Sequence, residues 1–182
     1  PTPIDSVITA VIRVSLAIFL CLTCLLKGHK RPFMPTLSFC AILEAARQLI
    51  EPWAARIAAR DHHLSAVKMM RDAMSQLESA ARDGSRRAVT EADLEFHRRL
   101  LEASGNAVIA RIARVIEPAL RRRDELTMHD EYITDLGFLP LHEAIVAAIE
   151  QGDEASAEHA ATELIESSSS DSTEALHSDQ SA

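Results

Sequence analysis

The stretch TEADLEFHRRLLEAS, residues 90–104, has the periodicity of a helix with one apolar face. Phe96, Leu100 and Leu101 recur at helical spacing, so a helix places them on one stripe that packs against a core. Asp93 and His97 stand four residues apart and fall on the same stripe. Ionisable side chains are rarely buried without a partner, because removing them from water is costly. We therefore expect this carboxylate and this imidazole to meet a partner inside the fold.

A second stretch, FLPLHEAIVAAIEQGD at 138–153, brings another histidine to an apolar stripe. His142 lies three residues before Ile145 and seven before Ile149, where an apolar side chain is expected. With the carboxylate and the imidazole of the first stretch, it makes three ionisable groups that point into one interior. Such a set favours a divalent metal or an anionic ligand.

Composition favours a single all-α domain. The 182 residues are 47% hydrophobic and 25% charged, with five glycines and 4% aromatics, and long stretches of Ala, Leu, Glu and Arg favour helices over strands. The formal charge of −8 argues against a nucleic-acid surface on this segment. The predicted fold is an antiparallel bundle of about six helices. They are expected at about 38–60, 64–83, 90–103, 107–133, 140–151 and 154–168.

Helix-end signals leave a second interpretation open for Asp93. Thr90 followed by Asp93 resembles a capping box, in which the carboxylate would serve only the first helical turn. Asn106 is expected to satisfy a helix terminus, and Asp153 to cap the last helix. Gly152 is expected to end the helix before it.

The two ends of the chain differ from the helical domain. Residues 1–37 form an atypical segment whose apolar part, 7–26, is long enough to span a membrane but contains Arg13. It could be an anchor, a core helix or sequence foreign to the native reading frame. Residues 169–182 are predicted to be a disordered polar tail. The chain has three cysteines, an odd number confined to the first forty residues, which is no disulfide framework and favours a reducing, cytoplasmic location.

Four short patterns, taken in order, resemble a known family. They are RQLIEP at 47–52, the pair Asp93-x-x-x-His97, SGN at 104–106, and the series that starts at His142 and ends at Gly152 and Asp153. Over about residues 41–168 the chain resembles the FCD domain, the C-terminal effector-binding domain of the FadR-like branch of GntR transcriptional regulators. In that branch an N-terminal winged helix-turn-helix binds DNA, and residues 1–40 do not resemble one.

The resemblance implies a helical bundle around a pocket that holds a divalent metal, with zinc, nickel or manganese the expected ions. It places metal ligands at Asp93, His97 and His142, and a small organic or sugar acid beside the metal. The last histidine of the family pattern falls on Leu164, which cannot ligate. Three outcomes stay open: three protein ligands completed by water or effector, a weakened site, or substitution by Glu163.

Arg47 is the candidate ligand-binding residue. Its guanidinium falls on an apolar stripe of the first helix, so it needs an anion, either the carboxylate of the effector or that of Glu51 one turn later. The predicted function is an effector-sensing, dimerising regulator domain that is not an enzyme and reaches DNA only through a domain absent here. The alternatives are a metal-dependent hydrolase and a membrane-tethered helical sensor.

Overall fold

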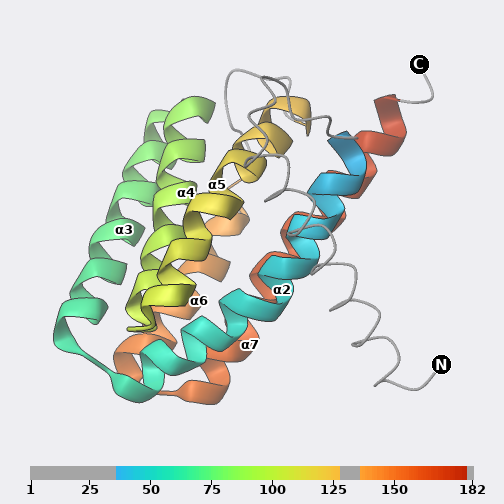
Figure 1. Cartoon of the computed structure of the whole chain (residues 1–182). Helices are drawn as coiled ribbons and strands as arrows, with labels where there is room; N and C mark the ends of the chain where they lie inside the picture. The colour runs from blue at the N-terminus through green and yellow to red at the C-terminus, as the bar shows by residue number, and fades with distance from the viewer. Residues whose placement is uncertain (1–35, 128–135, 180–182) are drawn as a thin grey trace. The chain divides into compact units, whose positions relative to one another are not determined.

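The computed structural model describes residues 36–127 and 136–179, and nearly all of them are helical (Figure 1). This part of the chain confirms the predicted all-α class and the expected order of helices. The bounds are α2 (Thr36–Asp61), α3 (Leu64–Asp83), α4 (Arg86–Ala103), α5 (Ala107–Thr127), α6 (Phe138–Gln151) and α7 (Glu154–Asp179).

The chain divides into two compact units within α2, residues 1–47 and residues 48–182. In the second unit α3 packs against α4 and α6, α4 against α5, and α6 against α7 (Figure 1). The connections between α3 and α4 and between α6 and α7 are only two residues long. Because so short a connection reverses the chain, each of these pairs is antiparallel, as a bundle requires.

The core of the second unit is built from the stripes that the sequence predicts. Met70 and Met74 of α3, Phe96 and Leu100 of α4, and Ile145 of α6 are all buried in one cluster. Small residues let the helices approach closely. Alanines line the C-terminal part of α2, and others line α7, where they join the same cluster at positions 55, 58, 59, 157, 160 and 161.

Two glycines end helices, and Gly152 does so as expected. Gly84 and Gly152 follow α3 and α6 with φ of 70° and 69°, in the left-handed region where a side chain is strained. Asp153 caps α7, since its Oδ1 accepts a hydrogen bond from the backbone N–H of Ser156 at 3.0 Å. Asn106 likewise accepts from the N–H of Val108 at 2.9 Å, which confirms its predicted role at a helix terminus.

One predicted helix start is wrong. Helix α4 begins at Arg86 with Ser85 as its N-cap, and the Ser85 hydroxyl accepts from the N–H of Ala88. Thr90 therefore lies inside the helix, and the capping-box interpretation of Asp93 fails because the helix has already been capped. Helix α7 ends at Asp179 and so extends into residues 169–182, which the sequence predicts to be a disordered polar tail. No Gly or Pro follows Gly152 in the sequence to interrupt that helix.

Some expectations concern residues that the structure does not describe. The apolar segment 7–26 and the last turns expected of α5, at 128–133, lie outside the described residues. Within residues 36–127 and 136–179, no helix has both the length and the apolar character needed to cross a membrane.

Arg71 of α3 joins its helix to α6 through two carboxylates. Its Nε and Nη2 donate to the two oxygens of Glu150 at 2.8 and 2.6 Å, and its Nη1 donates to Glu143 at 2.7 and 2.8 Å. The hydrogen bond from Arg71 lowers the pKa of the Glu150 carboxyl. A carboxylate whose pKa is lowered by folding adds stability above its unfolded pKa and loses that contribution as the pH falls.

We expect Arg71→Gln to lower the free energy of unfolding by about 1 kcal/mol at neutral pH, a modest value because these side chains are about one-third exposed. The difference from the parent should shrink below about pH 4, as Glu150 takes up a proton. Urea unfolding of the parent and the variant, at neutral pH and below about pH 4, measures this difference in the free energy of unfolding. Arg56→Gln is the control, since Arg56 is half exposed and pairs with Glu154 at 3.2 Å and with Glu158 at 3.6 Å. A constant difference between the two pH values would contradict the expectation.

Candidate metal centre

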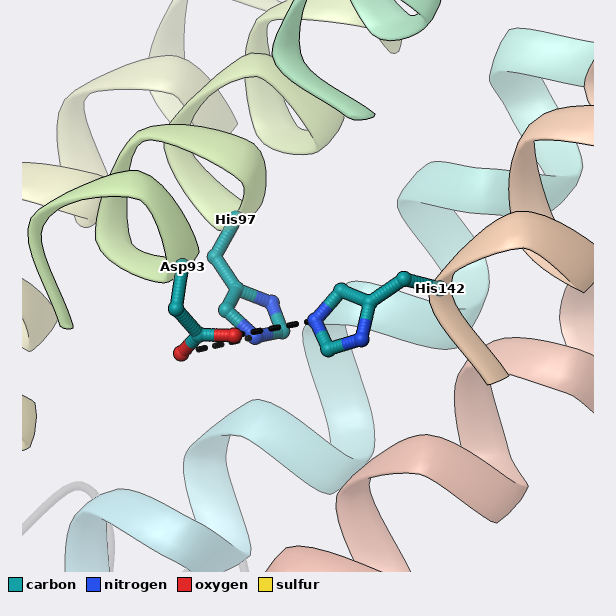
Figure 2. Close-up of side chains that lie close together, drawn as sticks. All are labelled: Asp93, His97 and His142. Atoms are coloured by element: carbon teal, nitrogen blue, oxygen red, sulfur yellow. Dashed lines mark hydrogen bonds and ion pairs between the residues drawn. The ribbon is translucent and has the colours of Figure 1, made fainter. Parts of the chain in front are cut away.

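Asp93 and His97 of α4 and His142 of α6 meet in the core of the second unit (Figure 2). His97 and His142 are buried, and the Asp93 side chain is about one-fifth exposed. Because α4 begins at Arg86, Asp93 and His97 lie one turn apart near the middle of the helix, on its inward stripe. The structure thus brings together the three residues that the sequence singles out as metal ligands.

The two imidazoles turn the same ring atom toward one carboxylate. Nε2 of His142 lies 2.9 Å from Oδ1 of Asp93, and Nε2 of His97 lies 3.7 Å from Oδ2 of the same residue. One ligand atom from each of the three side chains lies within 4.8 Å of the others. A metal bound at about 2.0–2.2 Å needs its donor atoms within about 4 Å of one another, so small side-chain rotations suffice.

The opposite ring nitrogens are held by other groups. Nδ1 of His97 lies 2.6 Å from Oε2 of Glu51, on α2, and Nδ1 of His142 lies 2.8 Å from the backbone carbonyl oxygen of Phe138. Metal-binding histidines usually have this arrangement, in which the second nitrogen donates to a carboxylate or a carbonyl and so orients the ring. Sequence analysis missed both contacts and assigned Glu51 only to Arg47.

The numbers of hydrogen-bond donors and acceptors favour a cation at the centre. A neutral imidazole carries one N–H, but both ring nitrogens of His142 face acceptors, Nδ1 the backbone carbonyl of Phe138 and Nε2 the carboxylate of Asp93. One N–H cannot serve both, so in a neutral ring one nitrogen turns its lone pair toward a group that also offers only lone pairs when Asp93 is ionised. A positive charge between these atoms, a proton or a metal ion, removes the conflict. The donor set therefore fits a divalent metal.

Aromatic rings support the two histidines from the side. The ring of Phe96 meets those of His142 and His97 edge to face, at centroid distances of 4.7 and 5.8 Å. Phe138 meets the ring of His142 in the same way at 5.8 Å. These contacts limit ring rotation, and they surround the polar cluster with apolar atoms that strengthen its electrostatic interactions.

The position at which the family pattern has its last histidine is occupied by a buried apolar side chain. Leu164 of α7 is buried in the same core cluster as Phe96. The side chain of Glu163 is half exposed and lies 3.4 Å from His159, itself a surface residue, so the substitution of Glu163 for the missing histidine is not supported. In the described part of the chain, the group that could hold a metal consists of three residues only.

Arg47 lies in the first unit, where it is buried and pairs with Glu44 three residues earlier, at 3.5 Å. The sequence offered Glu51 or an effector as its anion and did not suggest Glu44. The effector contact of Arg47 stays a prediction.

A cleft reaches His97 from the side of α5. Its lining includes Glu51, His97 and Arg98 together with Leu120 and Glu117 of α5, and its cavity volume is about 10 Å³, room for about one water molecule. Arg98 is already engaged by Glu95 and Glu102, at 2.5 and 2.6 Å.

Fold and site together define an all-helical domain with a carboxylate and two imidazoles gathered in its core. A family model described as the FCD domain matches residues 42–167, more than half of the chain, and the chain belongs to this family. The resemblance predicted from the sequence is thereby confirmed.

The comparison with solved structures agrees in fold. The chain is similar to Streptococcus agalactiae GntR, with a TM-score of 0.63 and 22% sequence identity. The match covers 75% of this chain and 60% of that chain, so the present sequence spans less than two thirds of its length. No match to the sequence was found among the curated proteins.

Proposed function

We propose that this chain is the effector-sensing domain of a GntR-type transcriptional regulator, with a divalent metal held by Asp93, His97 and His142. Zinc, nickel or manganese suits two imidazoles and one carboxylate. A small organic or sugar acid completes the coordination of the metal. Binding of the acid shifts the population between states that differ in DNA affinity, and a separate domain makes the DNA contact. Homodimerisation and a cytoplasmic location belong to the same proposal.

The observation that carries the proposal is the orientation of the two imidazoles. Both turn Nε2 toward Asp93, and both have Nδ1 within hydrogen-bond distance of an acceptor. This shared orientation is the one that metal-binding histidines have, with one nitrogen toward the metal and the other toward an acceptor. The FCD family match supports the regulatory function, because FCD domains are regulatory and non-enzymatic, and it disfavours the hydrolase alternative.

Metal loading of the full chain tests the proposal. The chain is stripped with a chelator and dialysed separately against zinc, nickel and manganese, and the bound metal is measured by elemental analysis. We expect close to one equivalent of at least one ion, and less than about a tenth of an equivalent would contradict the metal site. Hydroxy acids, dicarboxylates and sugar acids are then titrated by thermal shift, and they should stabilise the loaded chain more than the stripped one.

Leu164→His is expected to tighten metal binding about ten-fold, since it places an imidazole where the family pattern has its last ligand. Affinity is measured by competition with a chromophoric chelator. Ile165→His is the matched control, because Ile165 is also buried on α7 and its substitution introduces the same polar ring one residue away. Equal effects of the two variants would show that the last helix is out of register with the family pattern.

A further inference from the structure

Glu51 is a buried acid that the metal ligand set does not include. It lies on α2 with 1% of its surface exposed, and its Oε2 is 2.6 Å from Nδ1 of His97, 46 residues away in sequence. It is followed by Pro52 and by buried alanines that pack into the core. An ionised carboxylate in such surroundings lowers the stability of the fold unless it is paired, because it loses its hydration there.

The contact with His97 decides which nitrogen of that ring carries the proton. An ionised carboxylate can only accept, so a hydrogen bond at 2.6 Å places the proton of a neutral ring on Nδ1. Nε2 then carries the lone pair of the ring, and this is the atom that faces Asp93. A nearby negative charge also makes Nε2 a stronger donor to a metal.

The other imidazole is fixed in a different way. His142 has the backbone carbonyl of Phe138 at its Nδ1, which no substitution of a side chain removes. At Nδ1, the ring nitrogen that faces away from Asp93, His97 has a side chain as its partner and His142 has the backbone. Substitution of Glu51 should disturb one ligand and leave the other in place.

We propose that Glu51 is the positioning residue of the metal centre, which holds His97 in the Nδ1–H tautomer with Nε2 directed at the metal. This inference rests on the proposed metal site. It assigns Glu51 no bond to the metal. Its role is to prepare His97 before the metal arrives, so that binding requires neither a tautomer change nor a ring rotation.

The first measurement needs no metal. Long-range proton–nitrogen NMR spectra of the metal-free full chain, labelled with nitrogen-15 at histidine, report which ring nitrogen carries the proton. We expect His97 to be the Nδ1–H tautomer in the parent. In Glu51→Gln, whose amide can also donate to Nδ1, we expect His97 to shift toward the Nε2–H form, while the signals of His142 keep their pattern.

The second measurement is metal affinity, by chelator competition with zinc and nickel. Glu51→Gln should weaken binding about 10- to 100-fold, as the loss of an outer-shell partner typically does. Glu117→Gln is the matched control, because Glu117 lines the same cleft but pairs with Arg121 on its own helix. Its affinity should stay within about three-fold of the parent, as expected for an exposed ion pair.

Glu51→Asp is a second test of the proposal, for the case in which Glu51→Gln does not fold. Shortening the side chain withdraws the carboxylate from Nδ1, and we expect an intermediate loss of affinity. Suppose that the parent, Glu51→Asp and any folded Glu51→Gln bind metal equally well and that the His97 tautomer is unchanged. This result would overturn the role of Glu51 but would not contradict the metal site. A parent that binds neither metal would overturn the proposed function and this inference with it.

Discussion

Replacing His142 with alanine should abolish the binding of divalent metal by this domain. The change removes one of two imidazoles and leaves Asp93 and His97, both on α4, without a partner on α6. Two protein ligands on one helix hold a metal far more weakly than three from two helices. We expect at least a 100-fold loss of affinity, beyond the roughly 10- to 100-fold that outer-shell substitutions cost. Isothermal titration of the metal-free chain with zinc or nickel measures it.

His159→Ala is the control for this prediction. The His159 side chain is about three-quarters exposed and pairs with Glu163 on the surface of α7, so its removal should leave metal affinity unchanged. Circular dichroism of each metal-free variant establishes that the helices are intact before the titration. If His142→Ala is folded and binds metal as tightly as the parent, the metal is held elsewhere and the proposed centre is wrong.

Phe96→Ala should cause a large loss of stability. Phe96 is fully buried in the main core cluster and contacts both histidine rings edge to face. Truncation removes the ring and leaves a cavity, a combination that typically lowers the free energy of unfolding by about 3–5 kcal/mol. Chemical unfolding of the metal-free chain, followed by helical circular dichroism, measures the change without any contribution from metal binding.

Two further variants serve as comparisons for the loss of stability in Phe96→Ala. Phe96→Leu keeps much of the apolar volume and should cost clearly less than the alanine variant. Leu64→Ala changes a side chain that is 81% exposed, and its effect should stay within about 0.5 kcal/mol. A loss below about 1 kcal/mol in Phe96→Ala would mean that the core around the histidines collapses to fill the space.

The gathering of Asp93, His97 and His142 could be predicted from the sequence because helical periodicity places them on inward stripes. Each of these residues occupies a position where a leucine or isoleucine would otherwise pack, and the anomaly is visible without tertiary information. The same reasoning gave the inward face of α3, where Met70 and Met74 are buried.

Periodicity could not predict the partners of the cluster. Glu51 is 46 residues from His97, and only the packing of α2 against the core of the second unit brings their side chains together. A local pairing with Arg47, one turn away, was the natural interpretation of that carboxylate. The start of α4 was also misplaced, because Ser85 and Thr90 are both plausible caps and only the hydrogen bond to the N–H of Ala88 distinguishes them.

If the proposed metal binds, the location of the cluster has a consequence for the lifetime of the protein. His97 and His142 belong to helices that are separated in sequence by all of α5, so an ion bound to both closes a long loop of chain, as a cross-link does. The free energy of binding then adds to that of folding, by about 2.7 kcal/mol when free metal exceeds the dissociation constant 100-fold. A cell short of the metal would hold a larger unfolded fraction and lose the protein faster to proteolysis. The abundance of the domain would thus follow metal supply even when no effector is bound.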